Sequence, residues 1–329
     1  MTDYWFLIAG YINPRAQHLL RGVLETVVVS LVFYASFFQG SSARAETIQP
    51  DFALLYYAAQ LANQAYDGKS ELFGTLDGGT ALVAVPGETR VKYVLNFNHN
   101  RKLQVVAVRG TVNATNRELN RDTALVRDQK AGIDLHRGFR TAATTIYHDL
   151  KPKLRPGYTT YLVGHSLGGA VAAILGIYLS NDGLPIGQIV TFGQPKFTNL
   201  PGAITYRRLP LIRVIYQNDI VTLLPIRSPN SEQPLAHMGM ALNLLSGPYY
   251  VLADVERSTK FSVRSFRRML GQASIPDHRM RWYLQGLRDK LEIAAPVRFA
   301  DRNKFIVRHT MGTGLDTEPT NRTFNFNQR

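Results

Sequence analysis

Apolar and polar positions between residues 51 and 216 alternate in helix-like and strand-like segments. Residues 51–66 are rich in helix formers, and Asp67-Gly68 ends this predicted helix. Two β-branched runs flank a short polar stretch and predict an antiparallel hairpin of residues 90–97 and 103–108. The later segments are predicted helices at 139–150 and 167–179 and predicted strands at 159–163, 186–192 and 211–216. This alternation predicts an α/β fold with a mostly parallel central sheet flanked by helices.

The first 45 residues differ from the rest of the chain. A segment with Arg15 and Arg21 precedes an apolar run at 27–38, and small residues then lead to Ala45. A basic flank, an apolar run and an A-x-A site are typical of a secretory signal peptide at 1–45. The alternative is an uncleaved membrane anchor at 27–38, because the basic flank is long and aromatic. Both interpretations predict that the domain is exported. A cleaved leader gives a secreted or periplasmic protein, and the anchor a membrane-anchored one.

One domain at 46–296 accounts for the alternating pattern. Apolar residues make up 45% of the 329 positions, which is enough to bury one substantial core. Residues 297–329 are polar and predict a loosely attached C-terminal tail.

The net charge and the lack of cysteine limit the binding partners and the catalytic groups that the protein can have. The formal net charge of +14 favours anionic surfaces such as phospholipid headgroups. The Lys and Arg residues are scattered without a nucleic-acid-binding motif, so we expect no nucleic acid partner. The absence of cysteine excludes disulfides, thiolate nucleophiles and thiolate metal ligands.

Residues 263–270 alternate bulky apolar and basic side chains. This pattern suits either contact with an anionic membrane or lipid surface, or an ordinary surface helix.

A candidate nucleophile lies at a predicted turn from strand to helix. Gly164-His-Ser-Leu-Gly168 has the G-x-S-x-G pattern of a nucleophile elbow, between the strand ending at Val163 and the helix beginning at Leu167. The chain must reverse sharply to present Ser166, and glycines provide the room for this turn. The helix N-terminus favours negative charge, so we expect the backbone N–H of Leu167 to serve an oxyanion hole. The alternative is a chance Gly/Ser turn before a buried helix.

A serine nucleophile needs a base that is held by a carboxylate, and in this fold class the acid and then the histidine follow the serine. Asp219 lies just after the strand 211–216, at the edge where parallel strands gather ligand-binding loops. We predict that Asp219 is the acid. The alternative for this residue is a turn former in an Asn-Asp pair.

The histidines that follow Asp219 are His237, His278 and His309. His309 falls in the polar tail. His278 follows a Pro-Asp pair and precedes a helical pattern. It would thus lie on a loop that is held in place by a helix, while its side chain can still move, as a catalytic base must. His237 has small and apolar neighbours, which indicates a packed and hydrogen-bonded histidine. We therefore predict His278 as the base and keep His237 as the alternative.

A second oxyanion donor should come from the loop after an earlier central strand. The strand 103–108 ends in Arg109-Gly110-Thr111, and Thr111 offers both its N–H and its hydroxyl. The alternative is an ordinary strand exit.

Together these motifs resemble those of the class 3 lipases, the fungal-lipase-like family of α/β-hydrolases. The resemblance covers about residues 51–290 in the same order. The matching segments are Arg109-Gly-Thr111, His136-Arg-Gly-Phe139, Gly164-His-Ser-Leu-Gly-Gly169, Thr191-Phe-Gly-Gln-Pro195, Asn218-Asp219 with Leu224-Pro225, and Asp277-His278 with Tyr283. One departure is Phe197-Thr198-Asn199 in place of Val-Gly-Asn, which we expect to affect loop packing more than chemistry.

The resemblance implies an α/β-hydrolase fold and cleavage of acyl esters through an acyl-enzyme, without cofactor or metal. It also implies a lid at Val112–Asp134, which here has four basic and four acidic residues and no aromatic residue. A lid that closes over fat should present a broad apolar face. This lid hardly does, which leaves the substrate open between large neutral lipids and smaller or charged ones. We expect a triacylglycerol lipase or esterase, with a phospholipase or an acyltransferase as alternatives at the same site. A lipid-binding protein without catalysis is a further alternative, since fold does not determine function.

Overall fold

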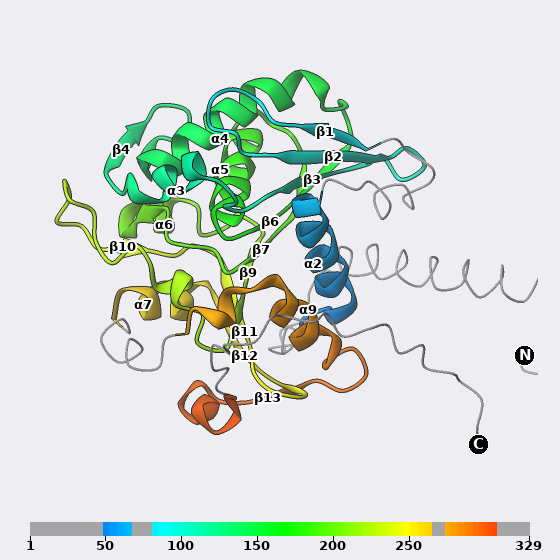
Figure 1. Cartoon of the computed structure of the whole chain (residues 1–329), viewed down its shortest axis with the longest axis vertical. Coiled ribbons are helices and arrows are strands. Elements are labelled where there is room, and N and C mark those ends of the chain that lie inside the picture. The colour runs from blue at the N-terminus through cyan, green and yellow to red at the C-terminus, as the bar shows by residue number, and fades with distance from the viewer. Residues whose placement is uncertain (1–48, 68–80, 265–273, 308–329) are drawn as a thin grey trace, which may run out of the picture.

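The computed structural model describes residues 49–67, 81–264 and 274–307 (Figure 1). Within these residues, nine strands form one sheet in the order β1-β2-β3-β6-β7-β9-β11-β12-β13. The central strands β3, β6, β7, β9 and β11 are parallel. The pairs β1-β2, β2-β3 and β11-β12 are antiparallel, and β13 pairs with β12 in parallel. The bounds are β1 Leu82–Ala84, β2 Tyr93–Asn98, β3 Leu103–Val108, β6 Thr159–His165, β7 Ile186–Phe192, β9 Leu211–Tyr216, β11 Met240–Leu244, β12 Tyr249–Ala253 and β13 Ala295–Pro296.

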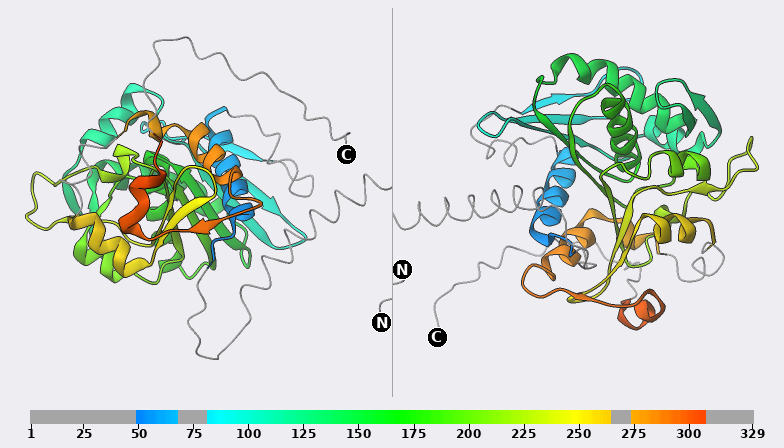
Figure 2. Two further views of the ribbon diagram at one scale, coloured as in Figure 1. Left: turned by 90° about the horizontal axis from the view of Figure 1, so that it is seen from below. Right: turned by 180° about the vertical axis from the view of Figure 1, so that it is seen from behind.

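Helices cover both faces of this sheet. On one face, α2 (Phe52–Asp67) and α9 (Met280–Arg288) lie side by side, as the blue and orange helices in Figures 1 and 2 show. On the other face, α4 (Arg137–Leu150) packs on α5 (Leu167–Asn181), whose residues 167–179 are all buried. Each face therefore has its own apolar core. This arrangement is an α/β-hydrolase fold, as the sequence predicted.

Shorter elements surround this framework. The helices α3 (Ala114–Arg121), α6 (Leu200–Thr205) and α7 (Val255–Arg264) lie at its periphery. A second sheet has the order β10-β8-β5-β4 and was not predicted. Its strands are β4 Leu125–Asp128, β5 Ile133–His136, β8 Thr198–Asn199 and β10 Leu235–Ala236.

The segment 197–199, which departs from the family pattern, belongs to this second sheet. Phe197 is buried, and the Thr198 hydroxyl donates a hydrogen bond to the carbonyl of Asp134 at 2.7 Å. The Asn199 side chain accepts from the N–H of Gly202 at 3.0 Å and so caps α6. Phe197 and Thr198, the two residues that depart from the pattern, thus take part in loop packing.

The predicted hairpin is present, since Tyr93 pairs with Val108 and Asn98 with Leu103.

The folded part of the chain extends beyond the predicted domain boundary at 296. The 3-10 helix η6 (Phe299–Phe305) is attached by the Ser246 hydroxyl, which donates to the Phe305 carbonyl at 2.7 Å. The N–H of Val307 also donates to the Gln217 side chain at 2.8 Å. The prediction of a loose tail is therefore wrong for residues 297–307, because their backbone is hydrogen-bonded to the domain.

Three predicted features lie outside the described residues: the leader at 1–45 with its alternative anchor at 27–38, the part of 263–270 beyond Arg264, and His309. In the described part of the chain, no helix is both long enough and apolar enough to cross a membrane. The same residues contain no group of three or more His, Asp or Glu side chains suited to hold a metal ion.

Candidate active site

The predicted nucleophile elbow is present as a sharp turn of the backbone at Ser166. Ser166 connects β6 to α5 with φ 58° and ψ −131°, a strained conformation for a residue with a side chain. A Cβ at Gly164 would clash with the carbonyl oxygen of Gly168, and a Cβ at Gly168 would clash with that of Val108. The tight turn therefore depends on glycine at both positions. It presents Ser166 at the carboxyl edge of the parallel strands.

The structure brings Ser166, His278 and Asp219 together. The Nε2 atom of His278 lies 2.8 Å from Oγ of Ser166, and its Nδ1 atom lies 2.7 Å from Oδ2 of Asp219. Asp219 follows β9 and begins the 3-10 helix η3 (Ile220–Leu223), while His278 ends η5 (Pro276–His278) just before α9. Three segments distant in sequence thus form one chain of hydrogen bonds, in the geometry of a Ser-His-Asp triad.

The carboxylate of Asp219 is fully buried and accepts hydrogen bonds at both oxygens. The N–H of Val221 donates to Oδ1 at 2.9 Å, and the Tyr283 hydroxyl donates to Oδ2 at 2.5 Å. Burial and the neighbouring carboxylate hold the pKa of Tyr283 well above its usual value, so this phenol stays a donor. These contacts stabilise the charge and the orientation of Asp219.

A second chain of hydrogen bonds holds the backbone of His278. The His165 Nε2 atom lies 2.8 Å from the His278 carbonyl oxygen, and the Tyr66 hydroxyl lies 2.7 Å from Nδ1 of His165. A carbonyl oxygen can only accept, so Nε2 of His165 donates and Nδ1 accepts from Tyr66. Burial, together with His278, lowers the pKa of His165 well below its usual value. His165 is therefore a neutral link between α2 and the candidate base.

Gly193 leaves room for the pair His278 and Asp219. Its φ is +56°, and a Cβ at this position would lie 2.7 Å from Oδ2 of Asp219 and 2.8 Å from Nδ1 of His278. This role of Gly193 was not predicted, although the glycine is part of the segment Thr191–Pro195 that carries the family resemblance.

A cavity of about 900 Å³ opens at Ser166. Its lining includes Ser166, His278 and Thr111, and its other residues are mostly apolar or aromatic. These include Tyr66, Phe139, Pro195, Val221, Leu224, Pro225 and Ile226. The Thr111 hydroxyl oxygen accepts a hydrogen bond from the Asn120 side chain at 3.0 Å. The cavity therefore joins the predicted nucleophile, base and oxyanion residue to an apolar wall.

Residues 105–228, which include Ser166 and Asp219, match the family model described as lipase (class 3). Over these residues the chain is similar to the class 3 lipases. It is 32% identical over 145 residues to the secreted mono- and diacylglycerol lipase 1 of Fusarium solani, a match over 40% of this chain and 42% of that protein. It is also 38% identical over 73 residues to a lipase of Caenorhabditis elegans, over 21% of each chain. The match thus spans less than half the length of either curated relative.

Solved structures of lipases share the fold of this chain. A triacylglycerol lipase described as having a serine protease triad has a TM-score of 0.54 and 22% identity, over 71% of this chain and 95% of that chain. The triacylglyceride lipase of Rhizomucor miehei has the same TM-score, with 21% identity and the same coverage. A lipase of Rhizopus microsporus var. chinensis has a TM-score of 0.53 and 23% identity, over 73% and 90%.

The predicted lid region contains a polar helix, α3, that is attached to the domain. The Asn116 side chain is buried and donates to the carbonyl of Thr89 at 2.9 Å. The Arg137 guanidinium pairs with Asp122, with Nε 2.8 Å from each carboxylate oxygen. Asn120 also reaches from α3 to Thr111. In this conformation α3 therefore contacts the candidate oxyanion residue directly.

His237, the alternative base, lies apart from the triad. It is buried, and its Nε2 atom lies 2.7 Å from the carbonyl oxygen of Thr222. Burial, with help from nearby Arg213 and Lys196, lowers the pKa of His237 well below its usual value. These contacts match those of a packed and hydrogen-bonded histidine.

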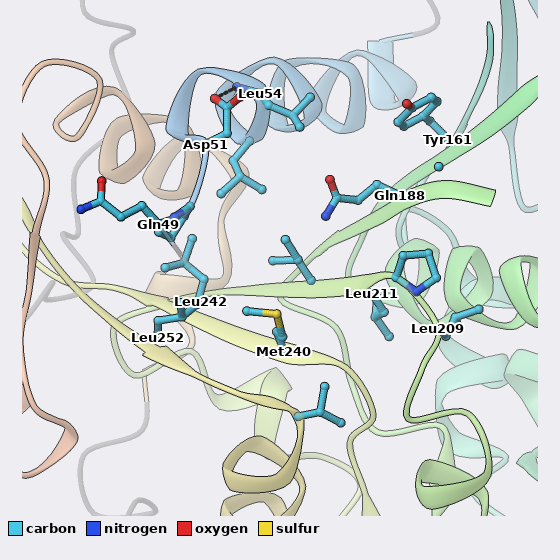
Figure 3. Close-up of a pocket in the computed structure, with 16 residues that line it drawn as sticks. Gln49, Asp51, Leu54, Tyr161, Gln188, Leu209, Leu211, Met240, Leu242 and Leu252 are labelled. Atoms are coloured by element: carbon cyan, nitrogen blue, oxygen red, sulfur yellow. Dashed lines mark hydrogen bonds between the residues drawn. The ribbon is translucent and has the colours of Figure 1, made fainter. Parts of the chain in front are cut away.

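A second cavity, of about 370 Å³, lies at the opposite end of the sheet (Figure 3). It is lined by residues near the amino ends of β7, β9 and β11, including Gln188, Leu211 and Met240, and by Leu54 near the start of α2. Ser166 follows the carboxyl end of β6, so this cavity is separate from the triad. Ligands of open α/β sheets bind at the carboxyl ends of the strands, which favours the cavity at Ser166 as the active site.

Proposed function

We propose that this protein is a serine hydrolase that cleaves carboxylic esters of lipids through an acyl-enzyme on Ser166. The observation that carries the proposal is the position of His278, whose two ring nitrogens contact Ser166 and Asp219 in the wall of an apolar cavity. The similarity of residues 105–228 to the class 3 lipase model and the named lipases among the relatives support a lipid substrate.

In this mechanism the Ser166 Oγ attacks the ester carbonyl and its proton moves to Nε2 of His278. Asp219 accepts from Nδ1–H, keeps the ring oriented and stabilises the imidazolium. The alcohol then leaves with the proton from Nε2. Water attacks the acyl-enzyme with His278 again as base, and the carboxylic acid and free Ser166 are formed.

We assign the oxyanion hole to the backbone N–H of Leu167 and to Thr111. Leu167 is the first residue of α5, so its N–H lacks a partner within the helix. The Thr111 oxygen accepts from Asn120, which leaves its own proton free to donate to the developing oxyanion. The Thr111 backbone N–H is a further donor at the same loop.

We also propose that the protein is exported. The basic, apolar and small-residue segments of positions 1–45 support this, as does the similarity to a lipase that is named as secreted.

A phospholipase activity is a second candidate, because Arg227 lies at the cavity. This residue is exposed, lines the cavity of Ser166, and forms no ion pair with an acidic side chain in the described ranges. Leu224 and Ile226, on the same segment, are exposed apolar residues. An acyl ester with an anionic headgroup would fit this combination of apolar wall and guanidinium.

The test of hydrolysis is labelling with a fluorophosphonate probe, followed by peptide mass spectrometry and assays on esters of increasing acyl length. The label is expected on Ser166, and Ser166→Ala should lose nearly all activity. The exposed Ser180→Ala is the matched control and should retain both label and activity. A folded protein that takes up no label at Ser166 would contradict the proposal and favour a lipid-binding scaffold without catalysis.

The substrate class is tested by comparing diacylglycerol, triacylglycerol, phosphatidylcholine and phosphatidylglycerol as substrates. If the phospholipase candidate is correct, Arg227→Gln should lower kcat/KM for phosphatidylglycerol at least about 10-fold and leave a neutral diacylglycerol unchanged. Equal losses for both lipids would exclude a headgroup contact. Product analysis with added alcohol separates hydrolysis from acyl transfer.

A further inference from the structure

Two basic side chains are buried together behind the segment that begins at Asp219. Arg213 on β9 and Lys196, after β7, are 2% and 3% exposed. Arg213 donates through Nε to the carbonyl of Met238 at 3.1 Å and through Nη2 to the hydroxyl of Ser258 at 2.6 Å. Its Nη1 atom is buried and forms no hydrogen bond with a described residue. This guanidinium therefore has donor capacity left over in the interior.

The sheet places no acid beside Arg213. Its register partners are Thr191 on β7 and Ala241 on β11, and partners in adjacent parallel strands project from the same face. Neither Lys196 nor Arg213 forms an ion pair with an acidic residue in the described part of the chain. The two positive charges thus lack a compensating negative charge among the described side chains.

Further polar atoms near Arg213 are also unpaired. The Thr191 hydroxyl and both side-chain atoms of the Gln194 amide are buried without a hydrogen bond to a described residue. Thr191 and Gln194 lie against the same residue of α5, since a Cβ at Gly169 would contact the Cβ atoms of both. Most of the unpaired groups are donors. Thr191 and Gln194 therefore lie near each other, on the face of the sheet from which Arg213 also projects.

Buried cations and donors are unfavourable without an acceptor. Taking a charge out of water is costly unless the charge is paired, and unpaired buried polar atoms often indicate an ordered water or ion. Burial and Arg213 lower the pKa of Lys196 to about 8, and burial lowers the pKa of Arg213 to about 9. The neighbouring His237 has its pKa lowered by burial and by both cations. A bound anion would offset this positive charge.

We propose that Lys196 and Arg213, with the Thr191 hydroxyl and the Gln194 amide, form a buried binding site for a small monovalent anion of the size of chloride. The donors come from β7, β9 and the segment after β7, so they surround the anion from several sides. A spherical anion accepts hydrogen bonds from any direction and needs no fixed geometry.

The site lies beneath the loop that carries Asp219. The N–H of Lys196 donates to the carbonyl of Leu224 at 2.7 Å, and Nε2 of His237 lies 2.7 Å from the carbonyl of Thr222. Both carbonyls belong to the segment that begins at Asp219 and continues through η3. An anion at this site would therefore stabilise the fold at the base of this loop, whether or not the protein hydrolyses esters.

The first test measures the melting temperature of the purified protein in chloride against isethionate, a bulkier anion, at constant ionic strength and pH 7. The wild-type Tm should rise by about 2–4 °C or more with chloride, since ligands of the folded state stabilise it. Lys196→Met should abolish this rise. Lys304→Met, at an exposed position, should keep it.

A second variant supplies the negative charge from within the chain. Ala241→Glu places a carboxylate on the strand next to Arg213, so its Tm in isethionate should exceed that of the wild type and chloride should add nothing. Crystals soaked in bromide should show an anomalous peak between Lys196 and Arg213. The proposal would be overturned if chloride raised the Tm of the wild type, Lys196→Met and Ala241→Glu equally. Stabilisation by phosphate and not by chloride would also overturn it, as would the absence of the bromide peak.

Discussion

Tyr283 donates a hydrogen bond of 2.5 Å to Oδ2 of Asp219, the same oxygen that lies 2.7 Å from Nδ1 of His278. Tyr283 belongs to α9, which also follows directly after His278 in the chain. One helix therefore positions both the candidate base and a donor to the candidate acid. If α9 moved, both ends of the contact between His278 and Asp219 would change together.

Tyr283→Phe should therefore lower catalysis without removing it. The substitution keeps the ring packed against Phe192 and Tyr216 but removes one donor to a buried carboxylate. A hydrogen bond to a charged group contributes about 1.5–3 kcal/mol, so kcat should fall by about 10- to 100-fold with little change in KM. Steady-state kinetics on a soluble ester measures this. Tyr250→Phe, a buried tyrosine away from the triad, should keep wild-type kcat, and a similar loss there would point to a general packing effect.

Gly193→Ala should inactivate the enzyme through contact with the triad. The added Cβ would lie 2.7 Å from Oδ2 of Asp219 and 2.8 Å from Nδ1 of His278, so these side chains must separate. Gly157→Ala is a matched control, because Gly157 also has positive φ, of 75°, but a Cβ there meets nothing within 4 Å. Both variants should lose roughly 1 kcal/mol of stability from backbone strain.

The two glycine variants should differ in activity. We expect a loss of at least about 100-fold in kcat/KM for Gly193→Ala, as for other displacements of about 1 Å at a reacting centre, and wild-type activity for Gly157→Ala. Chemical denaturation and ester hydrolysis measure the two effects. If Gly193→Ala kept wild-type kcat/KM, the contact of His278 with Asp219 would not be needed for catalysis.

The role of the Thr111 hydroxyl can be separated from that of its backbone. Thr111→Val removes the donor and keeps the shape, whereas Thr111→Ser keeps the hydroxyl that Asn120 contacts. Loss of one oxyanion donor lowers kcat by about 100- to 1000-fold. We expect such a loss for the valine variant and a loss of less than about 10-fold for the serine variant. Equal rates for the two variants would assign the oxyanion contact to the backbone N–H alone.

Local signals explain why the elbow could be predicted. A strand, two glycines around Ser166 and an apolar helix stand next to each other in the sequence, and each belongs to the same short turn. Asp219 and His278 were predicted from their order and their neighbours. The structure places all three within hydrogen-bonding distance, as that order suggested.

Other features depend on contacts that the local sequence does not contain. The strands β8 and β10 have only two residues each, and pairing with distant segments defines them. The contact of Tyr283 with Asp219 depends on which face α9 presents to β9. Arg213 did carry a signal, since it interrupts an otherwise apolar strand of a parallel sheet that is covered on both sides. Its burial shows that this interruption was informative.

Buried histidines should make stability depend on pH. His136 has no exposed surface, caps α4 by accepting from the N–H of Phe139, and stacks on the Phe139 ring at 3.8 Å. Burial lowers its pKa from the usual 6.5 to about 4. Because the folded state then binds fewer protons than the unfolded state, this contribution to stability is complete above about pH 6.5 and is lost as the pH falls toward 4.

The variant His136→Asn isolates this effect, because asparagine retains a capping side chain but does not titrate. Between pH 6.5 and 4, the wild type should lose about 3 kcal/mol more free energy of unfolding than the variant, at 1.36 kcal/mol for each unit of pKa difference. Urea unfolding at several pH values measures both slopes. The carboxylates with lowered pKa, such as Asp128 and Asp182, are common to both proteins and cancel in the comparison. Parallel slopes for the two proteins would mean that His136 takes up a proton in the folded state near its usual pKa, and that its burial is less complete in solution.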